Sequence, residues 1–467
     1  MAKLSEKIGY GLGDMSSSMF WKIFSYYLPI FYSDVFGLKP VHAATLLGIT
    51  RLYDAVSDPV MGIIADRTQT RWGKYRPYLL WLAIPFALIG IMAFYVPDAG
   101  YGFKHFYAYV AYILMMTAYT AVNVPYGAML GVVTADSKEK SVFSSFRMFF
   151  AYIGSFIAMG IFWLFEKSII GSTNSAGKVI KGVGDADPMQ WTSIVAIVAV
   201  LCAILFILCF LMTKEHVKIE RKPEAEGGSS IKDDLKALVS NGPWWLMLGA
   251  AIGQLLCGSI RGGAAAYYFA NILGVNIFLT CAVYLTIGEI GQMAGVAFAV
   301  PLSEKIGKRN TFMASMAAVV LFSSLIWFIP TGTAAGIWWL IVLQVLVSLA
   351  IGVAAPLTWS MFADVADYSE LKNGSNSTGL IFSSSSMAQK FGGAIGGFLL
   401  LALLGVFGYN KDLAVQAPRT LGAIKAMMSF IPAIGAALSI LALSFYPLTT
   451  SKMNEVQAEL KKKRGEA

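Results

Sequence analysis

The sequence has little charge, cysteine or histidine for its length. Of its 467 residues only 13% are charged while 57% are hydrophobic, and a soluble fold could not cover so much apolar surface with so few charges. The four cysteines show no CxxC spacing, and the three histidines form no metal-ligand motif. No Walker-type phosphate-binding motif is present. We therefore expect no enzyme, no cofactor and no nucleic-acid partner.

Long apolar stretches run through the whole chain instead. A helix needs about 20 apolar residues to cross a hydrocarbon core of about 30 Å, because each backbone amide must be satisfied within its own segment. Such stretches predict an all-α membrane protein with twelve transmembrane helices. Their expected ranges are 10–36, 42–65, 77–96, 104–131, 142–165, 191–212, 240–272, 276–301, 310–329, 336–363, 377–406 and 421–446.

The longest strongly polar stretch lies near the middle of the chain, at 213–239. It predicts an N-terminal six-helix bundle at 1–212, a cytoplasmic linker at 213–239, a C-terminal six-helix bundle at 240–446 and a cytoplasmic tail at 447–467. The sequence GIIADRTQTRWGKYRP after the second predicted helix resembles VPLSEKIGKRN after the eighth. We therefore expect two pseudo-symmetric halves, and we interpret these basic turns as topology and packing elements.

Basic residues are distributed unequally between the predicted loops. If both termini are cytoplasmic, the inner segments hold 23 Lys and Arg residues and the outer segments hold 7. This asymmetry predicts cytoplasmic termini in a bacterial inner membrane, and it accounts for the net charge of +9. The N-terminus has no compact apolar core followed by a small-residue cleavage site, so we expect the first helix to stay in the membrane as an anchor.

Asp54 and Asp58 give the strongest signal for a binding site. They are four residues apart in one predicted membrane helix, so they lie on one helix face with Ser57 nearby. Charged side chains inside a membrane are costly and usually serve function. Two carboxylates and a hydroxyl are hard oxygen ligands suited to Na⁺, Li⁺ or a proton, and Pro59 frees a backbone carbonyl. The alternative is a structural ion pair with Arg51.

Polar and aromatic residues on other predicted helices could contact a substrate. Sugar hydroxyls take hydrogen bonds, and the C–H face of a sugar ring stacks on aromatic side chains. The candidate substrate-binding residues are Asp14, Ser18, Trp21, Lys22, Tyr119, Asn123, Arg147 and Lys390. For any one of them a structural hydrogen bond is an equally good interpretation.

Several motifs resemble the glycoside–pentoside–hexuronide:cation symporter family of the major facilitator superfamily. They are RLYDAVSDPVMG followed by TRWGKYRPYLL, together with YGLGD, YTAVNVPYG, FADVADYSELK and QKFGG, and they span both halves of the chain. The resemblance implies two six-helix bundles around a cavity that opens alternately to either side. It also implies that Asp54, Asp58 and Thr120 bind the coupling cation, with Ser57 where melibiose permease has asparagine.

The resemblance extends to the sugar site but departs from the galactoside pattern. Arg147 and Lys390 match family positions at or beside the sugar. Two sugar-binding carboxylates of melibiose permease fall here on Ser18 and Asn123, and its stacking tryptophan falls on Gly127. Galactoside recognition of that kind is therefore not expected.

The basic residues suggest the charge of the substrate. Lys22, Arg147 and Lys390 would favour a carboxylate, so we hypothesise an acidic sugar such as a uronide, with a neutral pentoside or glycoside as the other possibility. The expected partners are this small molecule, a monovalent cation (Na⁺ or H⁺, with Li⁺ as a third choice) and membrane lipid, and we expect a monomer. An uncoupled sugar uniporter, or an exporter of a non-sugar solute, is the alternative function.

Charged residues in the predicted cytoplasmic turns could form an inner gate. Arg67 and Arg71 lie in the basic turn after the second predicted helix, and Asp136 and Asp364 lie near the inner ends of other helices. We expect these opposite charges, together with Lys74 and Arg76 of the same basic turn, to latch the gate. Substrate binding would then act by weakening the latch.

Overall fold

The computed structural model describes residues 3–38, 40–177, 179–180, 185–217, 231–273, 281–331, 333–373, 378–409 and 415–463. The side chains of Arg51 and Asp54 lie outside the described part. Within that part the regular structure is helical, apart from two isolated β-bridges, Thr70–Gly73 and Thr173–Val179.

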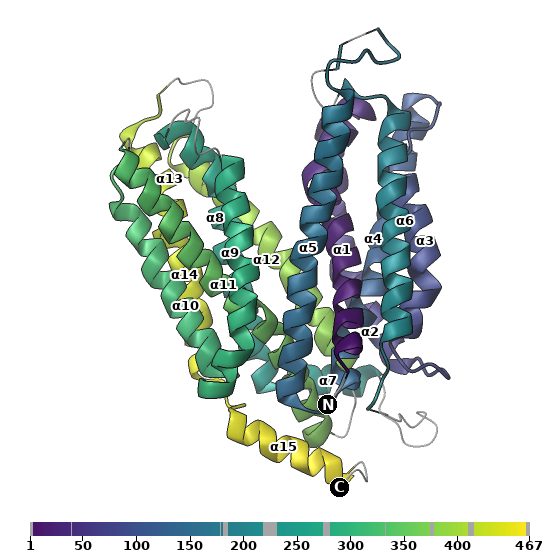
Figure 1. The fold of residues 1–467 in the computed structure, drawn as a ribbon, viewed down its shortest axis with the longest axis vertical. Coiled ribbons are helices and arrows are strands. Elements are labelled where there is room, and N and C mark those ends of the chain that lie inside the picture. The colour runs from purple at the N-terminus through teal and green to yellow at the C-terminus, as the bar shows by residue number, and fades with distance from the viewer. Residues whose placement is uncertain are drawn as a thin grey trace. The chain divides into compact units, whose positions relative to one another are not determined.

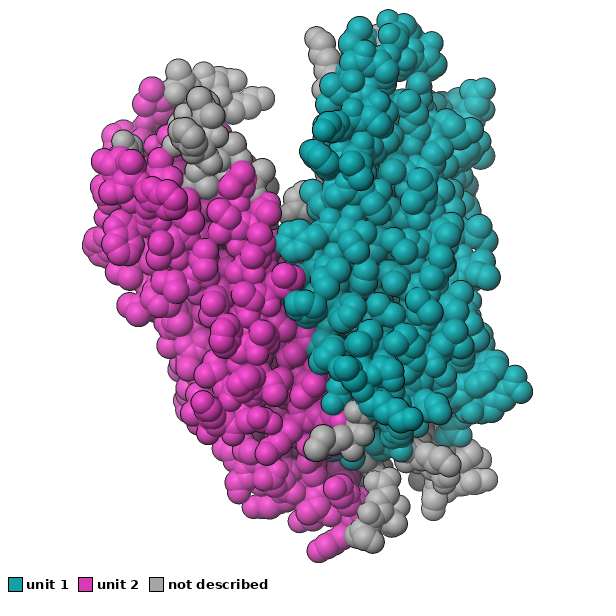
Figure 2. Space-filling view, in the orientation of Figure 1, with its two compact units in different colours: residues 1–135, 146–221, 378–383 teal, residues 136–145, 222–377, 384–467 magenta. Residues whose placement is uncertain are grey.

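The chain divides into two compact units, coloured separately in Figure 2. Unit 1 comprises residues 1–135, 146–221 and 378–383, and unit 2 comprises 136–145, 222–377 and 384–467. Most of unit 1 therefore comes from the first half of the chain and most of unit 2 from the second half. Two helices, α5 (Ser137–Ile169) and α12 (Thr378–Val406), contribute residues to both units.

Unit 1 is built from helices, most of which are labelled in Figure 1. Its other helices are α1 (Leu4–Ile30), η1 (Phe31–Val35), α2 (Pro40–Arg67), α3 (Pro77–Ala93), α4 (Tyr101–Val133) and α6 (Pro188–Met212). α6 packs against α1 and α3, and α4 packs against α2 and α3. An aromatic core lies where α3 ends and α6 begins, and in it the rings of Phe94 and Trp191 stack nearly parallel at 4°.

Unit 2 repeats this plan. Its other helices are α7 (Ile231–Val239), α8 (Gly242–Tyr268), η4 (Phe269–Leu273), α9 (Cys281–Ile306), α10 (Lys308–Leu325), η5 (Ile326–Phe328), α11 (Ala334–Asn373), α13 (Pro418–Met428), α14 (Phe430–Ser444) and α15 (Thr450–Lys463). α11 packs against α9 and α10, and α14 packs against α8 and α10. The first long helix of each unit, α1 or α8, has 27 residues and continues into a π-helical turn, as expected for an internal repeat.

Nine helical segments of the described chain are long and apolar enough to cross a membrane. They are α4, α5, α6, α8, α9, α10 with η5, α11, α12 and the pair α13–α14. α1 and α2 are also long enough, with 27 and 28 residues, but they carry more polar side chains, and α3 is a shorter apolar helix of 17 residues. These three complete the twelve helices predicted from sequence.

The last predicted membrane helix differs from the expectation of one continuous element. The structure divides it at Ser429, whose φ of −121° and ψ of −84° are not helical, into α13 and α14. Pro432 follows three residues later, and proline has no N–H to donate within a helix. Because the helix restarts just before Pro432, this proline lies in the first turn of α14, where backbone amides have no partner within the helix.

Candidate cation and substrate sites

The structure places Asp58 on α2 beside Thr120 on α4. Asp58 is completely buried, and its Oδ1 accepts a hydrogen bond from the Thr120 hydroxyl at 2.7 Å. The hydroxyl of Ser57 is buried and makes no hydrogen bond within the described part of the chain. Two helices of unit 1 thus bring a carboxylate and a hydroxyl oxygen together, with a second hydroxyl one residue away.

A buried carboxylate in this setting is suited to bind a monovalent cation or a proton. An isolated ionised carboxylate is expensive to bury, so its charge has to be balanced by a cation, a proton or several donors. Oxygen ligands of this kind match hard cations. The predicted second carboxylate, Asp54, has its side chain outside the described residues, as does its alternative partner Arg51.

Arg147 and Asp14 form a buried ion pair between α5 and α1. Nε of Arg147 donates to Oδ2 of Asp14 at 3.1 Å, and only 4% and 10% of the two side chains are exposed. The guanidinium also lies 5.0 Å from the ring centroid of Tyr126, whose ring stacks on Tyr10. Asp14 therefore neutralises Arg147, one of the three cations on which the prediction of an acidic substrate was based.

Trp21 and Tyr119 form an aromatic pair on α1 and α4. Their ring centroids are 5.3 Å apart with an interplanar angle of 35°. Asn123 lies one turn after Tyr119 and donates through Nδ2 to the Tyr119 carbonyl at 3.0 Å. Ser18 and Lys22, one turn apart on α1, are partly exposed like the aromatic pair. These five side chains in unit 1 combine ring faces with hydrogen-bonding groups, which a sugar requires.

Two other predicted positions are less accessible. Lys390 lies on the part of α12 that belongs to unit 2, with 8% of its surface exposed. At Gly127 a Cβ atom would lie 3.3 Å from Cδ1 of Phe382, so the neighbouring ring already occupies the space beside this glycine. Where melibiose permease has a tryptophan, this chain has Gly127 with the ring of Phe382 from α12 beside it.

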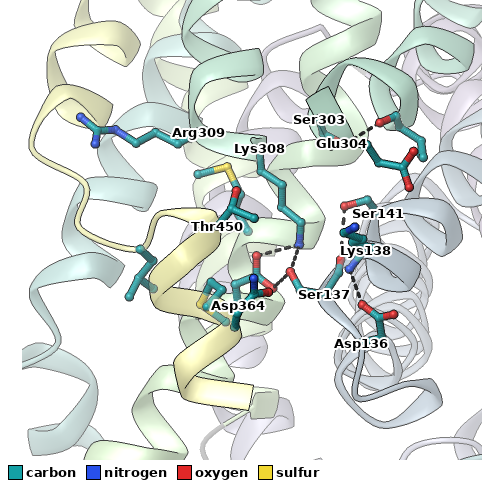
Figure 3. A pocket seen from close by; sticks show the side chains of 15 residues that line it. Asp136, Ser137, Lys138, Ser141, Ser303, Glu304, Lys308, Arg309, Asp364 and Thr450 are labelled. Carbon is teal, nitrogen blue, oxygen red and sulfur yellow. Dashed lines mark hydrogen bonds and ion pairs between the residues drawn. The ribbon is translucent and has the colours of Figure 1, made fainter. Parts of the chain in front are cut away.

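In unit 2 one ion pair joins α10 to α11, a second joins α5 to α11, and the hydroxyl of Ser137 on α5 adds a hydrogen bond. Asp364 accepts hydrogen bonds from Nζ of Lys308 at 2.7 Å and from the hydroxyl of Ser137 at 2.8 Å (Figure 3). Nζ of Lys140 lies 2.5 Å from Oδ2 of Asp367, and both side chains are almost fully buried. Ser137, Lys308 and Asp364 border a cavity of about 240 Å³ within unit 2.

The structure distributes the four predicted gate residues between the two units. Arg67 and Arg71 belong to unit 1 and are exposed, and the guanidinium of Arg71 lies 4.4 Å from the ring centroid of Trp72. Asp136 belongs to unit 2 and accepts a hydrogen bond through Oδ1 from the amide of Lys138 at 2.8 Å, at the start of α5. Asp364 also belongs to unit 2, and its partners there, Lys308 and Ser137, were not named in the sequence prediction.

Asp66 is a buried acid that the sequence prediction treated as part of a packing element. Its carboxylate accepts hydrogen bonds from the Tyr75 hydroxyl at 2.6 Å and from the amides of Gly379 and Leu380 at 2.8 and 3.0 Å. Lys74 adds an ion pair at 3.3 Å. Burial and the adjacent carboxylate raise the pKa of Tyr75 well above its ordinary value of 10, so the phenol remains a donor. A carboxylate at the N-terminus of α12 is also favoured by the helix dipole.

Glu215 fixes the turn that contains these residues. It follows α6, and its carboxylate accepts the amide hydrogens of Lys74, Tyr75 and Arg76, each at 2.8 Å. Gly73 precedes them with a φ of +117°, and a Cβ there would lie 2.4 Å from the Glu215 carboxyl carbon. Only glycine therefore allows both this backbone conformation and the close approach of Glu215.

Comparisons with known proteins agree with this architecture. The candidate glycoside/cation symporter YagG of Escherichia coli (strain K12) is 35% identical, over 99% of this chain and 95% of its own. The isoprimeverose transporter of Lactiplantibacillus pentosus is 32% identical, over 96% of this chain and 89% of its own. The glucuronide carrier protein homolog of Escherichia coli is 28% identical, over 97% and 94%.

A solved structure and a family model extend these likenesses to fold and family. The transporter FucP in its outward conformation superposes with a TM-score of 0.69 at 13% identity, covering 96% of this chain and 99% of that one. At that identity the likeness shows the fold. The family model described as MFS/sugar transport protein matches residues 9–450. The chain therefore belongs to this family of the major facilitator superfamily, as a multi-pass inner-membrane transporter and not an enzyme.

Proposed function

We propose that the protein couples uptake of a sugar or glycoside to the entry of Na⁺ or H⁺ by alternating access. The contact between Asp58 and Thr120 carries this proposal, because it joins a buried carboxylate on α2 to a hydroxyl on α4. Relatives named as a glycoside/cation symporter and an isoprimeverose transporter support the substrate class. The Trp21–Tyr119 pair supplies ring faces for a sugar on α1 and α4.

Binding of the cation and binding of the sugar would be coupled because both ligands contact α4. Thr120 on α4 contacts the proposed cation carboxylate, and Tyr119 is the adjacent residue in the aromatic pair. A cation at Asp58 would cancel a buried negative charge and hold α4 against α2, which fixes the position of Tyr119. Each ligand should then raise the affinity for the other by the same factor, as linkage requires.

We further propose an acidic sugar, such as a uronide, as the preferred substrate. Arg147 contributes little net charge because Asp14 neutralises it, so within the predicted set the preference depends on Lys22 and Lys390. A relative named as a glucuronide carrier protein homolog supports the acidic class, whereas the isoprimeverose transporter supports a neutral glycoside. Equal uptake of matched neutral and acidic sugars would contradict the acidic preference.

The test of symport is sugar uptake into proteoliposomes under an imposed Na⁺ or proton gradient. The native chain is compared with Asp58→Asn and with Asp98→Asn, an exposed aspartate between α3 and α4. We expect accumulation against a gradient in the native and Asp98→Asn proteins and its loss in Asp58→Asn. Accumulation that survives in Asp58→Asn would place the cation elsewhere. Sugar equilibration without accumulation in the native chain would favour a uniporter.

A further inference from the structure

A cavity of about 390 Å³ lies at one end of unit 1, beside the turn between α2 and α3. The turn borders it on one side, and the segment that follows α6 borders it on another. The charged residues among its described lining are Arg71, Lys74, Arg76, Lys214 and Glu215. All of them belong to unit 1, and the proposed cation and sugar sites use none of them. The cavity therefore has four cations and one acid around it.

The acids near this cavity already have partners. The carboxylate of Glu215 accepts three amide hydrogens of the turn, each at 2.8 Å, and so fixes the shape of the turn. Asp66 forms an ion pair with Lys74 at 3.3 Å. Among the described residues the other three cations of the cavity form no ion pair. An anion from outside the chain would therefore find positive charge that no carboxylate of the described chain pairs with.

Two aromatic rings hold the guanidinium groups of this cavity. The Arg71 guanidinium lies 4.4 Å from the ring centroid of Trp72, and the Arg76 guanidinium lies 4.2 Å from that of Phe210. The two rings meet edge to face, with their centroids 6.0 Å apart and an interplanar angle of 90°. Nε of Arg76 donates to the Phe210 carbonyl at 2.7 Å. Because a ring covers only the flat face of a guanidinium, the N–H groups at its edge stay available for an anion.

Exposed apolar side chains continue from the cavity along α3 and α6, which pack against each other. They are Trp81, Ile84, Leu88 and Met92 on α3, and Val200, Ile204, Leu208 and Leu211 on α6. Their spacings of three and four residues put each set on one face of its helix. Trp81 follows Arg76 by five residues, and Leu211 precedes Lys214 by three. In a membrane such faces contact acyl chains, so the cavity lies where the hydrocarbon core meets the headgroups.

We propose that this cavity binds the phosphodiester headgroup of an anionic phospholipid, whose acyl chains lie along the exposed faces of α3 and α6. Arginine and lysine donate to phosphate oxygens, and arginine can do so through two parallel hydrogen bonds. Basic pockets at the ends of membrane helices suit such headgroups, and tryptophan is enriched at the same depth. A lipid is favoured over soluble phosphate because only a lipid contacts both the cations and the apolar faces. This inference goes beyond the proposed transport and does not depend on it.

The experiment measures lipid binding to the purified full-length protein in a neutral detergent. Thermal unfolding midpoints are followed as dioctanoyl phosphatidylglycerol is added, and dioctanoyl phosphatidylcholine serves as a lipid of equal chain length without net charge. A ligand that binds only the folded protein raises the midpoint, so the size of the rise reports its affinity. We expect phosphatidylglycerol to stabilise the native protein saturably and to bind at least about tenfold more tightly than phosphatidylcholine.

Arg71→Gln and Lys214→Gln test the role of the cavity. Both side chains are exposed and form no ion pair within the described chain, so both variants should fold. Each should weaken phosphatidylglycerol binding by about fivefold, and the double variant should weaken it by at least about tenfold. Arg71→Lys should lose less than Arg71→Gln, since it keeps the charge. The matched control is Arg419→Gln in unit 2, which removes an exposed guanidinium 5.2 Å from the Phe407 ring centroid and should leave the affinity unchanged.

Four results would overturn the proposal. Equal stabilisation by the two lipids would show that headgroup charge is not recognised. Retention of phosphatidylglycerol affinity in the folded double variant would place the lipid elsewhere, and an equal loss in Arg419→Gln would show an effect of overall charge. Inorganic phosphate is the probe for a soluble anion. If phosphate stabilises the native protein but not the double variant, and phosphatidylglycerol adds nothing, the occupant is a free anion and the lipid assignment is wrong.

Discussion

The hydroxyl of Thr120 donates to Oδ1 of Asp58 across 2.7 Å, although 62 residues separate them in the chain. This bond joins side chains of α2 and α4 at the proposed cation site. A hydroxyl that donates to a carboxylate still has lone pairs for a metal ion, so both residues can act as ligands together.

Thr120→Val should weaken cation binding without preventing sugar binding. Valine has the shape of threonine but lacks the hydroxyl. One lost ligand or hydrogen bond corresponds to about 1.4 kcal/mol, or about a tenfold rise in the concentration of the coupling cation that gives half-maximal uptake. The matched control is Thr117→Val, one turn earlier on α4, where the exposed threonine contacts the hydroxyl of Tyr53. A rise of equal size in both variants would contradict a specific role for Thr120.

Asp14→Asn should destabilise the protein, because it leaves Arg147 buried without its carboxylate. Breaking a buried ion pair from one side costs about 3–5 kcal/mol. The double variant Asp14→Asn with Arg147→Gln should recover much of this loss, since it removes both charges. Chemical unfolding in detergent measures the coupling, and additive effects of the two substitutions would show that the pair contributes no interaction energy.

Tyr75→Phe should reduce stability and also alter its dependence on alkaline pH. The lost hydrogen bond to the Asp66 carboxylate corresponds to about 1.5–3 kcal/mol. Because the pKa of Tyr75 is raised in the folded protein, its contribution is complete below about pH 10 and is lost as the pH rises above that value.

The native protein should therefore lose more stability than Tyr75→Phe between about pH 8 and about pH 11. Unfolding midpoints at the two pH values give the comparison. Tyr95→Phe, at an exposed position, serves as the control. Parallel losses in the native and Tyr75→Phe proteins would exclude Tyr75 as the titrating group.

Gly127→Trp should not restore a galactoside site. A Cβ at Gly127 would already lie 3.3 Å from the Phe382 ring, so an indole would overpack this contact at a cost of about 1–3 kcal/mol. Gly127→Trp combined with Phe382→Ala should recover stability, as measured by thermal unfolding. Full stability of Gly127→Trp alone would mean that Phe382 moves aside freely.

The twelve helices and the internal repeat could be predicted from sequence because bilayer thickness imposes a length and composition on each span. The pairing of Asp58 with Thr120 was also predictable, through motif resemblance. The break at Ser429 was harder to see, since the apolar run continues through it and only Pro432 marks the change.

The partners of individual charges were not predictable in the same way. Within unit 2 Asp364 pairs with Lys308 and Ser137, and within unit 1 Asp14 neutralises Arg147. Composition and periodicity assign a residue to a helix face, but the identity of its partner depends on how distant helices pack.

The bonds from Asp66 to the amides of Gly379 and Leu380 also bear on how the chain is made. They join residues 313 and 314 positions apart. At about 5–20 residues per second, the ribosome needs roughly 15–60 s to reach α12 after finishing α2. Until then the Asp66 carboxylate has its local partners Tyr75 and Lys74 but lacks the two amides of α12. Truncation before α12 should therefore leave a nascent protein that quality-control proteases recognise, even though its first six helices are complete.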